Sequence, residues 1–301
     1  MNAIEPDSVL TIAIKDFQDA VRSWLFWGLS ALFFLLMIVS AAALAYFLDD
    51  PLTTQEFTFM LSSVTKLVIP LIALLVGWKA IAGEWESGSI KVLLSLPHSR
   101  MDAVLGKLLG RTAVLSISLA VGFVLASIGV VFAVESFSVV EYVGFLGMTV
   151  LYGLAYVSIA VALSSMTRST TIAAGLVLSV FVLFYVVWNL FQVALQVLMT
   201  QGYIEGVEIS FEDGGQTIER LPDWALFIDT LDPGNAYQNA LTVVSSGSSD
   251  EIGTTFGLPR EIMFPDGMPF YLQDWFSFVI LLAWILVPLA IALVRFDRTE
   301  L

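Results

Sequence analysis

The sequence predicts an all-α membrane protein in which six helices cross a lipid bilayer. Three observations support this fold class: long apolar runs, few charged residues, and an uneven distribution of lysine and arginine. Hydrophobic residues make up 58% of the 301 residues and charged residues only 13%, whereas soluble proteins average about 25% charged residues. A soluble core of this size does not need so much apolar sequence.

Six apolar runs are long enough to cross a membrane. A spanning helix needs about 20 mainly apolar residues to cross a hydrocarbon layer of ~30 Å. The runs cover residues 24–48, 57–82, 112–134, 142–163, 172–200 and 276–294. We therefore predict one transmembrane domain, residues 1–301, with six spans.

The lysine and arginine residues indicate the orientation in the membrane. With a cytoplasmic N-terminus, nine of the 13 lie in cytoplasmic segments, two lie outside and two fall within the second run. Cytoplasmic segments carry the excess of these residues in membrane proteins. We predict a multi-pass protein of the cell membrane with both termini in the cytoplasm.

The segment of residues 201–275, between the fifth and sixth runs, is long and acidic. It carries 13 of the 18 carboxylates that this orientation places outside, in a chain of net charge −14. Loops of this length usually have structure or function of their own. Its acidity has two interpretations: solubility in a saline exterior, or attraction of cations or of a basic partner.

Two patterns within this segment predict local structure. Apolar and polar residues alternate over 207–212 and 217–221, on either side of Asp213-Gly214-Gly215, which predicts a β-hairpin. Asp232 and Pro233 are suited to the N-cap and first position of a helix. We expect this short helix to lie at the outer membrane surface.

Residues 8–23, before the first run, show the pattern of an amphipathic helix. Apolar residues recur at three- and four-residue steps from Leu10 to Trp24, with polar residues between them. This pattern is typical of a helix lying along a membrane surface, here the inner one. The same apolar face would also suit packing on cytoplasmic parts of the chain itself.

Residues 83–111, between the second and third runs, are charged and punctuated by glycine. Pro97 predicts a break between two short helices, the second of which continues into the third run. Near the start, two carboxylates flank a tryptophan, and aromatic residues are enriched at protein interfaces. The candidate contact residues for another protein are Glu84, Trp85, Glu86, Ser87 and Gly88. The alternative is an ordinary charged loop with an interfacial tryptophan.

Polar residues inside two runs are candidates for a substrate path or a subunit contact. Lys66 lies well inside the second run, where a charge should face protein or water, unless its side chain reaches the membrane surface. In the fifth run, spacings of four, three and four predict one polar face, which either lines a route or forms interhelical hydrogen bonds. This face comprises Tyr185, Asn189, Gln192 and Gln196. Gly106 and Gly110 form a GxxxG pair, which is weak support for a dimer contact.

The residue types exclude several kinds of chemistry. The chain has no cysteine and a single histidine, His98, so thiolate sites and histidine clusters are excluded. A phosphate-binding GxxxxGK[ST] loop is also missing, because Met101 stands where the first glycine is needed and Leu108 follows Lys107. We predict a protein that is not itself an enzyme and binds no cofactor or metal.

The strongest pattern resembles the permeases of ABC-2 type transporters. It comprises Pro70-Leu71-Ile72-Ala73-Leu74-Leu75, then Ala82-Gly83-Glu84, Glu86, Gly88-Ser89, Leu93-Leu94-Ser95, Pro97, Ser99-Arg100 and Gly106-Lys107. The chain is most similar to the subgroup that includes the permease associated with nitrous oxide reductase maturation. Asp232-Pro233 with Ala236-Tyr237 is similar to an Asn-Pro motif of the family, with Asp in place of Asn.

The resemblance implies a fold, partners and an activity. The fold has six spans, an N-terminal elbow helix (8–23), a coupling helix within 83–111 and a long outer segment between spans five and six. The partners are two ATP-binding subunits, which hold ATP and Mg²⁺ and contact residues 84–88, and a second permease chain, which we expect to be identical. Membrane lipid surrounds the assembly, and no nucleic acid is involved. The implied activity is ATP-driven transport, with export as the expected direction.

Two other functions stay open at this stage. One is ATP-dependent maturation or remodelling of an extracytoplasmic partner protein, for which the acidic segment 201–275 is the best support. The other is secondary transport without a motor, which paired intramembrane charges or broken helices in matching halves would favour. Lys66 is isolated in the sequence, and no inverted halves are evident.

Overall fold

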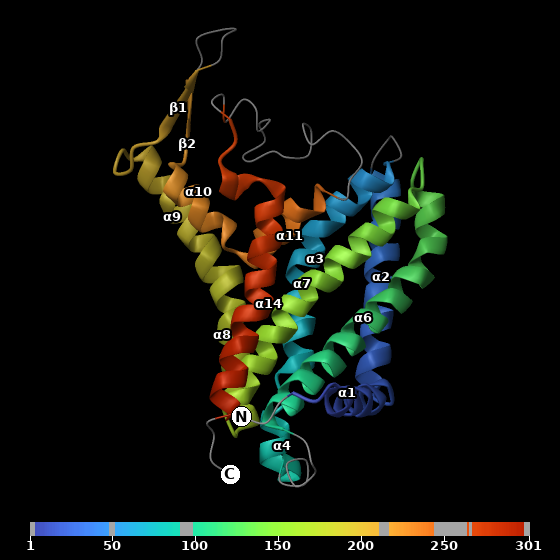
Figure 1. Cartoon of the computed structure of the whole chain (residues 1–301). Coiled ribbons are helices and arrows are strands. Elements are labelled where there is room, and N and C mark those ends of the chain that lie inside the picture. Colours follow the sequence, from blue (N-terminus) through green and yellow to red (C-terminus); the bar gives the residue numbers. More distant parts are fainter. Residues whose placement is uncertain are drawn as a thin grey trace.

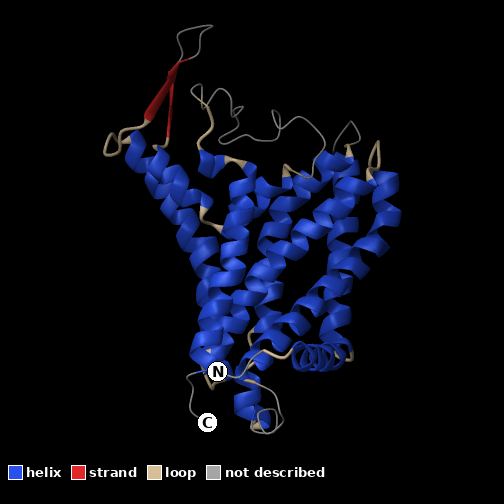
Figure 2. Cartoon of the chain, in the orientation of Figure 1, coloured by secondary structure: helices blue, strands red, loops and turns tan. Residues whose placement is uncertain are grey.

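The computed structural model describes residues 4–47, 52–90, 99–210, 217–243, 264 and 267–297. Helices make up almost all of this part of the chain, and most of them lie side by side along a common axis as a bundle (Figures 1 and 2). Six of the helices are long and apolar enough to cross a membrane, as predicted. The predicted break at Pro97 lies outside the described residues, as does His98.

The six spans follow the predicted runs closely. They are α2 (Trp24–Phe47), α3 (Thr54–Gly77), α6 (Arg100–Ala133), α7 (Val139–Ser165), the continuous α8 (Thr170–Val182), η1 (Leu183–Val187) and α9 (Trp188–Thr200), and α14 (Asp274–Asp297). The segment η1 is a π-helical turn inside the fifth span. We call the two ends of the bundle the α4 end and the β-hairpin end, after the elements that project there (Figure 1).

Two helices that do not span lie at the α4 end. Helix α1 (Pro6–Val21) crosses the direction of the spans, so that Figure 1 shows it nearly end-on. Helix α4 (Ala82–Ser87) continues below α3 and projects beyond the spans (Figure 1). The predicted amphipathic segment 8–23 therefore forms a helix, although its start and end lie two residues earlier.

The helix of the third span begins at Arg100, before the apolar run that starts at residue 112, so the second of the two predicted short helices continues into the span as expected. A capping box starts the helix: Ser99 Oγ accepts from the Asp102 amide at 3.0 Å, and Asp102 Oδ2 accepts from the Ser99 amide at 2.9 Å. No proline follows until the helix ends at Ala133, so the polar turn at 100–111 and the apolar run form one helix. This places polar side chains of the α4 end on a rigid extension of the span.

Helix α7 is the centre of the bundle, and the fifth span is its edge. In the most apolar window of α7, 67% of residues are buried, against 17% for the span of α8, η1 and α9. Tyr152 and Tyr156 on α7 are completely buried, and they pack on Tyr237 and Phe184 respectively. The fifth span is therefore held by few contacts within this chain.

The predicted β-hairpin is confirmed. Strand β1 (Val207–Ser210) pairs antiparallel with β2 (Thr217–Arg220), so that Glu208 lies opposite Glu219. The strands project from the bundle (Figure 2). Residues 211–216, between the strands, lie outside the described residues.

Two short helices follow β2, and their position corrects one prediction. Helices α10 (Asp223–Thr230) and α11 (Pro233–Leu241) form a helical hairpin whose turn is Leu231-Asp232. Asp232 caps α11 as predicted, because its Oδ2 accepts from the Asn235 amide at 2.9 Å. A 3₁₀ turn, η2 (Phe270–Leu272), then leads into α14.

The helical hairpin does not lie at the end of the bundle but between the spans. The indole of Trp284 donates to the Leu231 carbonyl at 2.9 Å. Trp284 lies ten residues into α14, which is about 15 Å along a helix that rises about 1.5 Å per residue. The turn therefore lies inside the bundle, where its buried polar groups have hydrogen-bond partners. Helix α11 is not a surface helix.

Candidate functional site

Two polar clusters stand out from the apolar bundle. The α4-end cluster comprises Asp16, Glu84, Lys107 and Arg111. The hairpin-turn cluster comprises Lys66, Asp229, Asp232, Asn235, Gln238 and Gln192. Each joins helices that are far apart in the sequence.

Lys107 joins three helices in the α4-end cluster. Its ammonium lies 2.8 Å from Asp16 Oδ1 on α1 and 2.7 Å from Glu84 Oε1 on α4. Arg111, one turn along α6, places its Nε 2.9 Å from Asp16 Oδ2. Ser89 also donates to the Glu84 carboxylate. Two cations balance two carboxylates, so the buried cluster is neutral and fixes α1 and α4 to α6.

The GxxxG pair packs on the chain's own first helix. A Cβ at Gly106 would lie 2.6 Å from the Ile12 Cβ, and one at Gly110 would lie 2.9 Å from the Asp16 Cβ. The two glycines therefore let α1 lie directly on α6. The pair is occupied within the chain, which corrects the weak prediction of a dimer contact.

The remaining contacts of α4 fix it to the turn between α7 and α8. Ser164 Oγ accepts from the amides of Ile81 and Ala82 at 3.1 and 3.0 Å. The Thr170 amide donates to Glu86 Oε2 at 2.8 Å, and the Arg168 guanidinium lies 4.5 Å from the centre of the Trp85 ring. The inward side of α4 is thus held by the bundle, while Ser87 and Gly88 are exposed.

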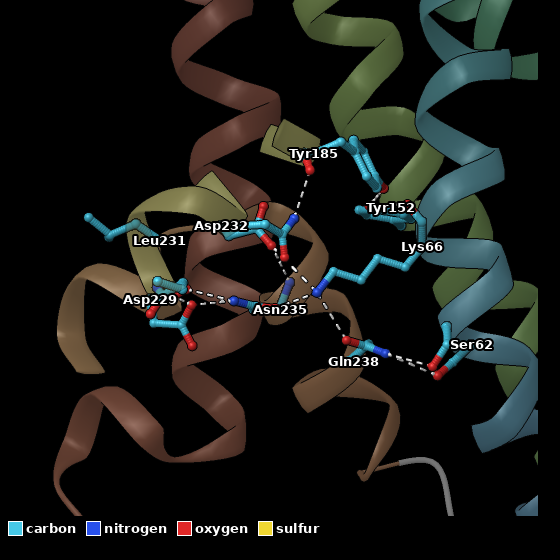
Figure 3. Close-up of polar contacts among 12 residues, drawn as sticks. Ser62, Lys66, Tyr152, Tyr185, Asp229, Leu231, Asp232, Asn235 and Gln238 are labelled. Atoms are coloured by element: carbon cyan, nitrogen blue, oxygen red, sulfur yellow. Dashed lines mark hydrogen bonds and ion pairs between the residues drawn. The ribbon is translucent and has the colours of Figure 1, made fainter. Parts of the chain in front are cut away.

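Lys66 is the centre of the hairpin-turn cluster (Figure 3). Its ammonium donates to Asn235 Oδ1, donates to Gln238 Oε1 at 3.1 Å, and lies 3.7 Å from Asp232 Oδ2. Gly234 makes this possible, because a Cβ there would lie 2.5 Å from the Lys66 Cε. The lysine of the second span therefore holds the start of α11 inside the bundle.

Asp229 joins the hairpin to the fifth span. Its Oδ1 accepts from Gln192 Nε2 and from Asn235 Nδ2, both at 2.6 Å. Burial and the nearby charge of Asp232 raise the pKa of Asp229 to about 6, although Lys66 opposes the shift. Burial also raises the pKa of Asp232, again against the effect of Lys66.

Tyrosines cover the Lys66 side of the cluster. The Tyr152 hydroxyl donates to the Lys66 carbonyl at 2.9 Å and lies 3.2 Å from the Tyr185 hydroxyl (Figure 3). The Tyr152 and Tyr237 rings stack with their centres 4.5 Å apart. The rings of Tyr152, Tyr185 and Tyr237 border the cluster, with their hydroxyl groups as polar edges and their ring faces as apolar surface.

Within the described residues, no group of three or more histidine, cysteine, aspartate or glutamate side chains is arranged to hold a metal ion. Lysine and amide groups instead satisfy the carboxylates. The arrangement is suited to joining helices, not to holding a metal.

Comparison with known proteins gives the family. Residues 10–301 match the family described as ABC-2 family transporter protein. The chain belongs to the ABC-2 transporter family. The predicted family resemblance is thus confirmed, and this ABC-2 protein is a multi-pass membrane permease of an ABC transporter.

Two curated relatives agree with this family. The "Probable ABC transporter permease protein NosY" of Pseudomonas aeruginosa is 30% identical over 234 residues, 74% of this chain and 78% of that protein. The protein of the same name from Stutzerimonas stutzeri is 28% identical over 302 residues, 97% of this chain and 99% of that protein. Membership implies an ABC ATP-binding partner subunit, since the family consists of membrane subunits.

The structure of this ABC-2 permease separates the polar residues predicted in the fifth span. Gln192 belongs to the hairpin-turn cluster and Tyr185 lies beside it against Tyr152, whereas Gln196 and Asn189 are exposed. Asn189 donates to the Tyr185 carbonyl of its own helix at 2.9 Å. The π-helical turn at η1 changes the rotation only between Tyr185 and Asn189. Asn189, Gln192 and Gln196 lie in the regular helix α9, where Gln192 reaches Asp229 of the α10–α11 hairpin. A substrate path along these residues stays a prediction.

Lys66 faces protein, which is one of the two surroundings predicted for it. Within the part of the chain that the structure describes, it makes intrachain contacts with three side chains of α11 and its N-cap, so it need not reach the membrane surface. The sequence reasoning missed Asp229, Gln238 and Asp16. Only Asp16 left a signal, because it occupies the apolar face of α1 with Ile12 and Ala20.

Proposed function

We propose that this permease moves a substrate across the cell membrane, most simply as an exporter, using ATP hydrolysed by a separate subunit. Two ATP-binding subunits, which hold ATP and Mg²⁺, act with two copies of this chain. The α4 end then faces the cytoplasm, as the distribution of lysine and arginine favours. The chain itself needs no cofactor for this role.

The position of α4 carries the proposal. This helix projects beyond the spans (Figure 1), and Glu86, Ser87 and Gly88 are exposed there. Gly88 ends the helix in the left-handed conformation, with φ of 76°, which turns the chain sharply. An exposed helix of this kind offers a compact surface for a subunit on the same side of the membrane.

The inward side of α4 supports a coupling role. Glu84 and Trp85 are partly buried and bind Lys107 and Arg168, on α6 and on the turn before α8. A force on the exposed side of α4 therefore acts directly on the third span, on α1 and on the fifth span. Rigid-body motion of such connected helices is a common form of conformational change.

Substitutions on the exposed side of α4 test this function. We expect Glu86→Lys and Ser87→Trp to reduce co-purification of the ATP-binding subunit, or its transport-coupled ATP hydrolysis, while membrane insertion stays normal. Glu135→Lys is the matched control, because Glu135 is an exposed carboxylate between α6 and α7, at the opposite end of the bundle from α4. Normal subunit binding and normal coupling in both α4 variants would contradict the proposal.

A second function rests on the β-hairpin, namely remodelling of a partner protein on the other side of the membrane. Glu208 and Glu219 are exposed and lie directly opposite each other in the strand pair. Like charges in this position destabilise a strand pair. A basic partner surface would relieve this repulsion.

Glu208→Lys separates this function from a purely structural hairpin. The substitution replaces the repulsion by a lysine–glutamate pair, so the hairpin should become more stable while capture of a basic extracytoplasmic protein is lost. Co-purification from membranes, with Glu135→Lys as control, measures the second effect. Unchanged capture of the basic protein would show that the hairpin is not part of the binding surface.

A further inference from the structure

The hairpin-turn cluster contains more negative than positive charge. Asp229 and Asp232 both lie at the turn between α10 and α11, and Asp232 is only 4% exposed. Among the described residues, the one ion pair of Lys66 is with Asp232, and no lysine or arginine forms an ion pair with Asp229. Ionised Asp229 therefore adds a negative charge that no cation balances directly.

Neutral donors are the direct partners of Asp229. Gln192 and Asn235 both donate to Oδ1, which also remains an acceptor when the other carboxylate oxygen carries a proton. A partly buried carboxylate without its own cation favours the neutral form, since low polarity penalises the charge. The geometry thus accommodates a protonated Asp229 without the loss of either hydrogen bond.

We propose that Asp229 is a proton-binding site and that proton binding is linked to docking of the α10–α11 hairpin between the spans. In acidic solution the docked hairpin holds one proton on Asp229, taken up from water. When the hairpin leaves its position, the carboxyl group becomes hydrated and the proton returns to water. Acidic solution therefore favours the docked hairpin.

Charged and polar groups from several elements surround Asp229. Lys66 faces it from α3 and Asp232 from the N-cap of α11. The amides of Gln192 and Asn235 contact it from α9 and α11, and the indole of Trp188 also faces it from α9. The α14 side contributes the neutral indole of Trp284, bound to Leu231. Tyr152, Tyr156 and Tyr185 face Asp232 from α7 and η1.

The sign of the linkage follows from the two states. The pKa of Asp229 is about 6 in the docked hairpin and would fall towards the ordinary value of 3.8 after hydration. Between these values the docked state binds more protons, so docking weakens as pH rises from 3.8 to 6. Above this window both states are ionised, and docking no longer depends on this group.

A single engineered cysteine measures docking, because the chain has no cysteine of its own. Ala236 on α11 is 1% exposed, so the thiol of Ala236→Cys reacts with a membrane-impermeant reagent only when the hairpin opens. The full chain is labelled in nanodiscs between pH 4.5 and 8. Rates are divided by those of Val243→Cys, an exposed site just beyond α11, to remove the pH dependence of thiol chemistry.

We expect the corrected labelling rate to fall roughly tenfold per pH unit below about pH 6 and to be constant above it. Adding Asp229→Asn, which imitates the protonated group, should keep the rate low at every pH. The matched control is Asp223→Asn on the same helix, an exposed carboxylate paired with Arg220, which should keep the original profile. The same pH dependence with Asp229→Asn as without it would overturn the proposal.

Infrared difference spectroscopy tests the proton directly and needs no engineered thiol. Between pH 5 and 8 the protein should show a carboxylic acid band that Asp229→Asn removes and that Asp223→Asn retains. Retention of the band in Asp229→Asn would assign the proton to another residue and overturn the proposal. Absence of any such band at pH 5 would do the same.

Discussion

The Lys107 ammonium lies 2.7 Å from the Glu84 carboxylate and thereby joins the base of the third span to α4. The same ammonium lies 2.8 Å from Asp16 on α1. Gly106, one residue before the lysine, allows α1 to approach closely enough for this second contact. The α4 end is thus one connected unit of three helices, and its stability is open to direct test.

Removing the cation at the centre of this unit should destabilise the protein strongly. Lys107→Met leaves Asp16 and Glu84 without their shared partner, and breaking a buried ion pair from one side costs about 3–5 kcal/mol. We expect a clear fall in Tm of the purified chain. Lys79→Met is the matched control, because Lys79 is exposed and lies over the Trp78 ring. Equal Tm values for the two variants would mean that the cluster is not a stabilising element.

A methyl group at Gly106 should separate α1 from α6. The added Cβ would meet the Ile12 Cβ at 2.6 Å and the Val9 carbonyl oxygen at 3.0 Å, so α1 must shift. Overpacking of this kind costs about 1–3 kcal/mol. Gly147→Ala on α7 meets nothing within 4 Å and should stabilise the helix instead. Thermal unfolding and protease sensitivity of α1 measure both effects.

Gly234→Ala should displace the Lys66 side chain from α11. The new Cβ would lie 2.5 Å from Lys66 Cε and 3.1 Å from Asp232 Oδ2. With the lysine moved, Asp232 loses its cation and the hairpin should open more often, which the labelling rate at position 236 detects. Gly175→Ala on α8, which meets nothing within 4 Å, is the control and should leave that rate unchanged.

Trp284→Phe should weaken the turn of the helical hairpin. The Leu231 carbonyl would lose its indole donor, and an unsatisfied buried acceptor costs about 1–3 kcal/mol. Trp275→Phe removes an exposed hydrogen bond to Gln273 and should have little effect. A comparison of their Tm values decides whether the indole anchors the turn.

The pH dependence of stability should change when Asp229 is replaced. The raised pKa of about 6 means that ionisation opposes the native state, so this group lowers the unfolding free energy as pH rises from 3.8 to 6. Asp229→Asn should therefore be more stable relative to the original chain at pH 7 than at pH 4. A stability difference that is the same at both pH values would contradict this assignment.

Prediction from sequence worked where a local pattern was sufficient. The six spans, the β-hairpin and the Asp232 cap each depend on residues close together in the chain, such as an apolar run or an N-cap followed by proline. Prediction from sequence was wrong where the position of a helix within the bundle depends on distant residues. Helix α11 was expected at the membrane surface, because nothing near Asp232 indicates that Lys66 and Trp284 provide buried partners.

The sequence by itself therefore determined a six-span ABC-2 permease without an ATP-binding loop of its own. The length of an apolar run and the distribution of charged residues depend only on the order of residues in the chain. They can therefore be counted from the sequence without coordinates. Only the tertiary structure decided which charges meet, as at Lys107 with Asp16 and at Lys66 with Asp232. Such pairs form across helices distant in sequence, where packing, and not local spacing, sets the distance between side chains.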